Sequence, residues 1–186
     1  MSLLWSKYSK LKFNEKNLIL LCKCLNVKFE IKKNKLHTIL NGKDVTLEIL
    51  DEKIVCIASK ISLFPILRKF LIKIQKNFYK IPGLIAEGRD MGSVVFPEAE
   101  IKIFLHASIK ERAIRRTIQL QKKGFNVNFN NIMYDMKKRD ELDINRSISP
   151  LIPDSQSFII DSTLLRTEEV IDIIFNYVKK IKKIFI

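Results

Sequence analysis

Glycine, proline and cysteine are all scarce in this chain. The 186 residues include five Gly and five Pro, so no stretch is typical of a flexible linker or of low complexity. Of the three cysteines, Cys22 and Cys24 form a C-x-C pair, but the sequence has no C-x-x-C pair and no histidine at zinc-site spacing. We therefore expect reduced thiols in the core and no metal site.

Long apolar runs are also missing. The longest, Leu18–Cys22, is far shorter than the ~20 residues that a membrane span needs, and the N-terminus has no uninterrupted apolar segment like that of a signal peptide. These absences predict a cytoplasmic protein without a membrane partner. Apolar residues nevertheless make up 47% of the chain and charged residues 29%, which is typical of one globular unit.

Negative charge is in short supply, because 20 acidic residues face 34 basic ones and leave a net charge of +14. This excess suits a nucleic-acid-binding protein, a membrane-surface protein or an enzyme for phosphorylated substrates, and charge alone does not choose among them. Only eight basic residues are arginine, and seven of these lie between positions 68 and 146. A guanidinium fork suits phosphate, although chance clustering or a solvated helix face would give the same pattern.

Apolar spacing in the first half predicts hairpins between helices. Three alternating runs within residues 27–50, separated by KKNK and NGKD, predict a small antiparallel unit. Helical spacing covers much of residues 1–25 and 53–80, with a kink or a helix boundary at Pro65.

The second half predicts a parallel sheet with helices, and hence an α/β chain. Short apolar runs of the kind buried in parallel sheets occupy residues 84–86, 101–105 and 158–160. The capping-box spacing of Ser108 and Glu111 predicts a helix that runs to Gly124. We expect a second helix over about 128–142, and acidic residues in a first turn predict a third from near Thr167.

The segment GLIAEGRD (83–90) has the G-x-x-x-x-G spacing of an ATP-binding P-loop but is not one. Arg89 replaces the lysine, and Asp90 replaces the hydroxyl residue and would repel phosphates. We interpret the segment as a strand that delivers Glu87, Arg89 and Asp90 into a polar cleft. Taken alone, these residues could equally form a structural ion pair.

Two further groups of arginines have helical spacing. In RDELDINR (139–146), Arg139, Asp143 and Arg146 are at i, i+4 and i+7 and can face a single ligand, although a solvated helix face explains the same pattern. The second group has the spacing i, i+3 and i+4 and consists of Arg112, Arg115 and Arg116. These arginines either form a solvated helix face or act as a mobile clamp that stabilises phosphoryl oxygens.

Together these segments closely resemble the bacterial cytidylate kinase family. The resemblance rests on GLIAEGRDMGSVVFPEAEIKIFLHAS, ERAIRR, QKKGFNVNF, RDELDINRSISPL and FIIDST, and it runs from about Val27 to Lys180. It implies a P-loop-kinase-like parallel sheet flanked by helices, with a kinase core at 1–26 and 60–186. It also implies a helical lid at about 108–130 and an antiparallel monophosphate-binding insert at 27–59.

The resemblance also implies a role for each candidate site residue. Ser59, Arg68 and Asp90 match positions that recognise the cytosine ring, and an acceptor beside a hydroxyl is able to distinguish cytosine from uracil. Arg89 and Arg139 match positions that hold the substrate phosphate, whereas Asp143 and Arg146 match positions that read sugar and base. The lid arginines, which act in catalysis together with Arg139, are matched by Arg112, Arg115 and Arg116.

The family's opening strand, its P-loop ending in Gly-Lys-Gly-Thr, the following helix and a Ser-Gly-x-x-Tyr-Arg segment have no counterpart here. We therefore expect an N-terminally truncated fold with an incomplete site for ATP and Mg²⁺, whose binding residues stay unknown. The truncation indicates either a start further upstream or a decayed gene product.

The sequence thus predicts a monomeric kinase that transfers the γ-phosphate of ATP to CMP or dCMP. Two alternatives remain. One is a remnant or CMP-binding module without an ATP site. The other is a nucleic-acid-binding protein, which the interleaving of arginines with acids disfavours.

Overall fold

The computed structural model describes residues 1–3, 13–146 and 148–183. Contacts between residues divide the chain into two compact units, Met1–Leu84 and Ile85–Ile186. Part of the helical pattern predicted for residues 1–25 falls on residues 4–12, which lie outside the described residues. Its later part forms helix α2 (Glu15–Lys23).

A three-stranded antiparallel sheet belongs to the first unit. Strands β1 (Val27–Lys32), β2 (Lys35–Leu40) and β3 (Lys43–Asp44) are neighbours in this order. Two-residue turns join them, and all four turn residues have positive φ, as type I′ turns require. The predicted hairpins are therefore confirmed.

The third of the predicted alternating runs, at residues 45–49, does not form a strand. Asp44 Oδ1 accepts hydrogen bonds from the backbone N–H of Thr46 at 3.0 Å and from its hydroxyl at 2.6 Å, and this local turn bends the chain away from the sheet. The two bonds, together with one from the His37 ring, lower the pKa of Asp44. The chain then enters a 3₁₀ turn, η1 (Glu48–Leu50).

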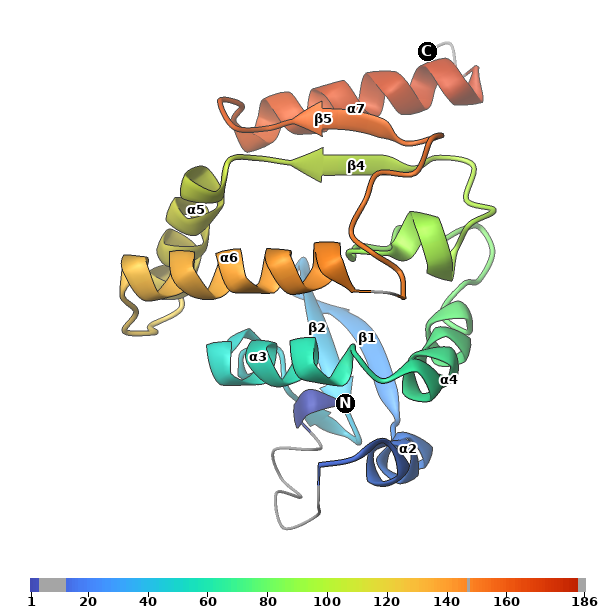
Figure 1. The fold of residues 1–186 in the computed structure, drawn as a ribbon. Coiled ribbons are helices and arrows are strands. Elements are labelled where there is room, and N and C mark those ends of the chain that lie inside the picture. The colour runs from blue at the N-terminus through green and yellow to red at the C-terminus, as the bar shows by residue number, and fades with distance from the viewer. Residues whose placement is uncertain (4–12, 147, 184–186) are drawn as a thin grey trace. The chain divides into compact units, whose positions relative to one another are not determined.

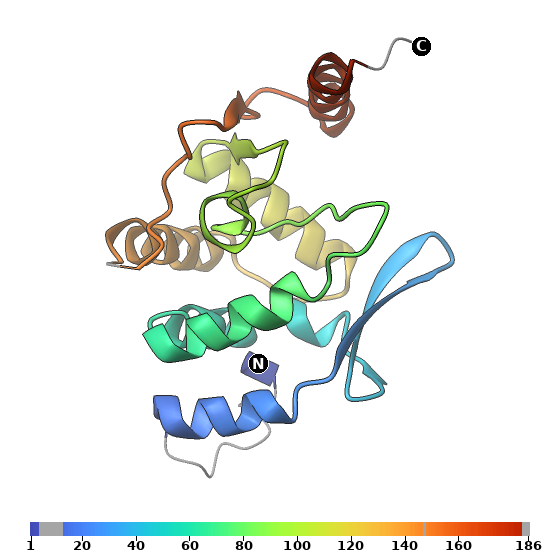
Figure 2. The same cartoon turned by 90° about the vertical axis from the view of Figure 1, so that its right-hand side faces the viewer.

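Helices α3 (Glu52–Ile61) and α4 (Pro65–Lys76) complete the first unit with α2. Pro65 is the first residue of α4, so the predicted helix boundary is confirmed. Helices α2 and α4 lie side by side (Figure 2), and Glu15 Oε1 accepts hydrogen bonds from the first backbone N–H groups of α4. The core between the helices comprises Leu18, Leu21, Cys22, Ile61 and Leu67.

All three cysteines are free, but only one lies in the core. Cys22 is buried, and this burial raises its pKa to about 11. Cys24 and Cys56 are exposed, so the predicted core position is wrong for these two.

A two-stranded parallel sheet belongs to the second unit (Figure 1). Strand β4 (Ile103–His106) pairs with β5 (Phe158–Asp161) along its whole length. Helix α7 (Thr167–Lys182) packs on β5 through the stacked rings of Phe158 and Tyr177, whose centroids are 4.2 Å apart. The parallel sheet with its helices confirms the predicted α/β class.

The strand predicted at residues 84–86 does not form. The Ile85 side chain is fully exposed, and no segment within the described ranges pairs with these residues. Because a strand needs a neighbour to take its backbone hydrogen bonds, an apolar run alone does not produce one. A π-helical turn, η2 (Met91–Val95), follows instead.

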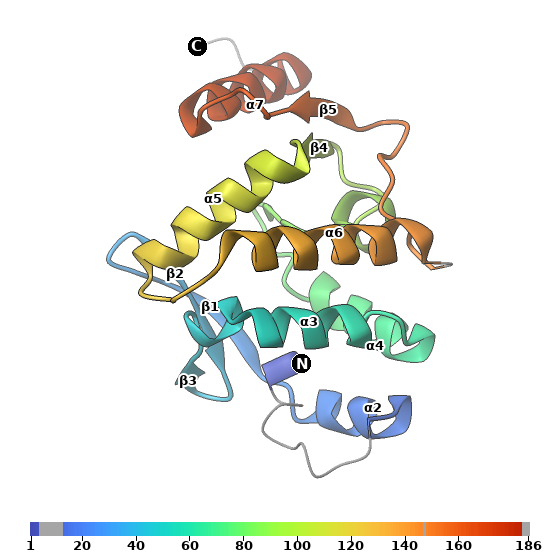
Figure 3. The same ribbon diagram turned by 60° about the vertical axis from the view of Figure 1, so that its left-hand side comes forward.

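Helices α5 (Ile109–Lys122) and α6 (Phe129–Asn145) lie side by side and are joined by a short loop, as Figure 3 shows. The Ser108 hydroxyl caps α5 by accepting a hydrogen bond from the backbone N–H of Glu111. Gly124 follows the last turn with a φ of 85°. The predicted start and end of this helix are therefore confirmed.

Candidate functional site

Asp143 of α6 lies among three arginines. Its side chain is only 5% exposed. Asp143 Oδ2 lies 2.7 Å from Arg89 NH1 and 3.8 Å from Arg139 Nε, and Oδ1 lies 3.1 Å from Arg146 NH1. Because a buried charge is tolerated only when it is paired, the carboxylate and the guanidiniums depend on one another. The structure thus brings Arg139, Asp143 and Arg146 together, as their spacing predicted.

Asp140, one turn earlier on α6, joins the same group. Its Oδ1 lies 2.9 Å from Arg89 NH1, and its Oδ2 lies 2.6 Å from Arg112 NH2. Arg112 belongs to α5 and Arg89 to the loop before η2, so one carboxylate connects three segments. Asp140 was not among the predicted site residues, although its i, i+3 relation to Asp143 places both on the same side of the helix.

Asp90 lies at the edge of this group, with Oδ2 4.0 Å from Arg146 NH2. Its backbone carbonyl accepts hydrogen bonds from the N–H groups of Val94 and Val95, so the turn η2 holds Asp90 where a strand was predicted to do so. We call the whole set the arginine–aspartate cluster. It comprises Arg89, Arg112, Arg139, Arg146, Asp90, Asp140 and Asp143.

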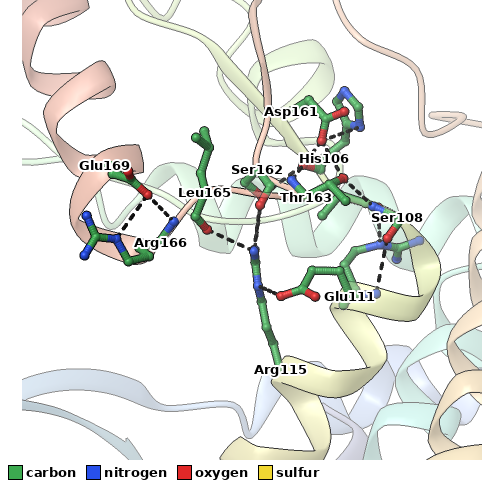
Figure 4. Close-up of polar contacts among 12 residues, drawn as sticks. His106, Ser108, Glu111, Arg115, Asp161, Ser162, Thr163, Leu165, Arg166 and Glu169 are labelled. Atoms are coloured by element: carbon green, nitrogen blue, oxygen red, sulfur yellow. Dashed lines mark hydrogen bonds and ion pairs between the residues drawn. The ribbon is translucent and has the colours of Figure 1, made fainter.

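The other two arginines of α5 contact different parts of the second unit. Arg115 NH2 donates to the carbonyl of Ser162 at 2.6 Å and to that of Leu165 at 3.1 Å, in the loop between β5 and α7 (Figure 4). Arg116 NH1 donates to Gln119 Oε1 at 2.9 Å on its own helix. Of the three predicted lid arginines, the structure places Arg112 in the cluster and the other two outside it.

Polar residues lie at or just after the carboxyl ends of both parallel strands. Asp161 Oδ1 accepts hydrogen bonds from the hydroxyl and the backbone N–H of Thr163, and these bonds lower the pKa of Asp161. The Thr163 hydroxyl in turn accepts a bond from the backbone N–H of Ser108 at 2.9 Å (Figure 4). The loop after β5 is therefore tied to the start of α5.

Ser59 and Arg68 belong to the first unit. Ser59 is on α3 and Arg68 is on α4. Arg68 NH1 donates to the carbonyl of Ser62 at 3.3 Å, and the Ser62 hydroxyl donates to the carbonyl of Ser59 at 2.7 Å. Ser62, at the end of α3, thus links these two predicted base-recognition residues.

The cluster has the chemistry of an anion site. Four guanidinium groups lie beside three carboxylates, and guanidinium donors are well matched to phosphate oxygens. Arginine contacts every one of these carboxylates, which makes them poor ligands for a hard divalent cation. In the described part of the chain, no group of three or more His, Cys, Asp or Glu is placed to hold a metal ion.

None of the helices in the described ranges is long and apolar enough to cross a membrane.

Comparison with known proteins gives consistent matches. The family model for cytidylate kinase matches residues 5–180. A cytidylate kinase of Erwinia tasmaniensis is 46% identical over 156 residues, which cover 84% of this chain and 69% of that protein. Cytidylate kinases of Shigella sonnei and Escherichia coli K12 are 45% and 44% identical over 90% of this chain and 74% of their own lengths.

The match spans both contact units and includes every residue of the arginine–aspartate cluster. On this evidence the chain belongs to the cytidylate kinase family.

Proposed function

We propose that this chain binds CMP or dCMP as the acceptor of a phosphoryl group from ATP. In this reaction an oxygen of the acceptor phosphate bonds to the γ-phosphorus of ATP while the bond to the β-phosphate oxygen breaks, which gives CDP or dCDP and ADP. The observation that carries the proposal is the arginine–aspartate cluster. Its guanidiniums supply the cationic donors that phosphate needs, and the names of the relatives supply the nucleotide.

The proposed site residues divide by the part of the substrate they contact. Arg89 and Arg139 hold the acceptor phosphate. Asp143 and Arg146 read the sugar and base. The cytosine ring is recognised by Ser59, Arg68 and Asp90. Polar groups that pair with cytosine are left without partners when uracil is bound, and burying them unpaired costs free energy. We therefore expect UMP to be the poorer substrate.

Phosphoryl transfer depends on positioning and on stabilising the charge of the equatorial phosphate oxygens. We assign this stabilisation to Arg139 and to the lid arginines, which are Arg112, Arg115 and Arg116. The lid covers residues 108–130, the monophosphate-binding insert residues 27–59, and the kinase core residues 1–26 and 60–186.

ATP is the proposed donor, and Mg²⁺ neutralises its phosphates when bound. We assign no ligand of this chain to the metal, because arginine already engages the carboxylates of the cluster. In this proposal the protein acts as a monomer in the cytoplasm.

A CMP-binding module without phosphoryl transfer is the second candidate. It is favoured by one sequence observation, because the 186 residues contain no G-x-x-x-x-G-K-[ST] segment. In a P-loop kinase the amides and lysine of that segment hold the donor phosphates.

An assay of ADP formation distinguishes the candidates. The purified protein is given ATP and Mg²⁺ with CMP, dCMP or UMP, and the Arg89→Met variant serves as the control for contaminating kinases. We expect CMP and dCMP to support ADP formation well above UMP and above the variant. CMP binding without ADP formation would favour the second candidate, and the absence of both would contradict both.

A further inference from the structure

We propose that Asp140 is a positioning residue, which holds Arg89 and Arg112 in a fixed relation so that Arg89 offers its remaining donors to the acceptor phosphate and Arg112 lies beside it to meet the phosphoryl group in transfer. The inference rests on the proposed function, since it specifies how the phosphate site is organised. Asp140 has no role in the assignment of base, sugar and phosphate contacts above.

The two oxygens of Asp140 serve two different arginines. Oδ1 takes Arg89 NH1 at 2.9 Å, and Oδ2 takes Arg112 NH2 at 2.6 Å. Both distances are typical of charge-assisted hydrogen bonds and ion pairs. A carboxylate is rigid and planar, so one that contacts both guanidiniums restrains their separation and partly compensates their positive charge.

The contacts of Asp140 leave useful donors on both arginines. Arg89 uses NH1 for Asp140 and Asp143, and its Nε and NH2 have no hydrogen-bond partner among the described residues. These two groups form the edge that binds phosphate in a bidentate manner. Arg112 uses Nε for the carbonyl of Ala107 and NH2 for Asp140, which leaves NH1.

Asp143 is not placed to hold Arg89 and Arg112 together in the absence of Asp140. Its carboxylate already contacts Arg89, Arg139 and Arg146, and it is 5% exposed. Asp140, by contrast, reaches from α6 to Arg112 of α5. Its substitution therefore separates the phosphate arginine from the lid arginine, while Asp143 still holds Arg89.

Asp140→Asn tests this arrangement most directly. The amide keeps the shape of the side chain but presents an NH₂ group to one of the two guanidiniums, so one arm loses its acceptor. Glu141→Gln is the matched control, because it removes the same charge from the exposed neighbouring position on α6. Asp140→Glu keeps the carboxylate and provides the conservative rescue.

The first readout is the pair of side-chain Nε–H signals of Arg89 and Arg112 in ¹H–¹⁵N NMR spectra, assigned with Arg89→Lys and Arg112→Lys. We expect both signals to shift in Asp140→Asn and to stay in place in Glu141→Gln. Unchanged signals in Asp140→Asn would overturn the proposal, whether or not the protein binds CMP.

The second readout is the affinity for CMP by calorimetry, with the melting temperature recorded for each variant. We expect Asp140→Asn to weaken CMP binding by about tenfold and Asp140→Glu to restore it to within about threefold of the wild type. Affinity that falls equally in Glu141→Gln, or only in step with the melting temperature, would contradict a positioning role. A wild-type protein that does not bind CMP would refute the proposed function, and the NMR signals would still decide the placement of the arginines.

Discussion

The side chains of Asp143 and Arg146 are 5% and 6% exposed, so both charges lie almost entirely out of water. Each is tolerated because the other is present, at an N–O distance of 3.1 Å. The main chain adds to this arrangement, because the carbonyl of Asp143 accepts a hydrogen bond from the N–H of Leu151 at 2.8 Å. The end of α6 is therefore held by charge pairing as well as by its backbone.

Asp143→Asn tests that dependence. Removing one partner of a buried pair leaves the remaining charges uncompensated, so we expect the free energy of unfolding to fall by about 3 kcal/mol or more. Urea unfolding followed by circular dichroism measures the change. Asp172→Asn, at an exposed position of α7, is the matched control and should change stability by less than about 0.5 kcal/mol. Equal effects of the two substitutions would contradict this account of the cluster.

Sequence spacing predicted part of the cluster and missed the rest for a physical reason. Arg139 and Asp143 lie one turn apart on α6, and Arg146 is the residue that caps its C-terminal end, so local geometry is enough to bring them together. The part played by Asp140 depends on α5 lying beside α6, which is a tertiary arrangement that no local pattern reveals. The same holds for Arg112. Its spacing groups it with Arg115 and Arg116, and nothing in the neighbouring sequence indicates that it contacts Asp140.

Helix α5 connects the arginine–aspartate cluster with the loop after β5. It begins at the Ser108 cap, and it carries Arg112 into the cluster and Arg115 to the loop after β5. It ends just before Gly124, whose φ of 85° is a conformation that other residues adopt only with strain.

Gly124→Ala tests the C-terminal end of α5. At both Gly124 and Gly83, no atom lies within 4 Å of where a Cβ would stand. The two differ in their backbone, because Gly124 has positive φ and Gly83 does not. We therefore expect Gly124→Ala to reduce the free energy of unfolding by about 1–2 kcal/mol. The control, Gly83→Ala, should be neutral or slightly stabilising, because alanine narrows the unfolded ensemble. Chemical denaturation measures both, and similar values for the two would contradict the role given to the backbone of Gly124.

Elements with strong local signals could be predicted, and those that depend on partners could not. The hairpin turn at Asn41 and Gly42 and the cap at Ser108 are specified by a few neighbouring residues, and the structure confirms them. The run at residues 84–86 has the composition of a buried strand, but its backbone finds no pairing segment among the described residues. An apolar, strand-like run forms a strand only when another segment is present to pair with its backbone.

At the scale of the whole molecule, the proposed substrate residues come from both contact units. Ser59 and Arg68 belong to Met1–Leu84, and the residues of the arginine–aspartate cluster belong to Ile85–Ile186. The predicted α/β class and the family are confirmed. The roles of individual residues stay predictions, because sequence resemblance identifies matching positions and does not measure what they bind.

The central claim is that the arginine–aspartate cluster is the phosphate-binding part of a CMP site. Calorimetric titration of CMP into the wild-type protein, Arg89→Met and Arg166→Met tests it most directly, since Arg166 is a highly exposed arginine at the start of α7, outside the cluster. The account predicts one saturable site whose affinity falls by about tenfold or more in Arg89→Met and stays unchanged in Arg166→Met. No saturable binding to the wild-type protein, or an equal loss in both variants, would contradict it.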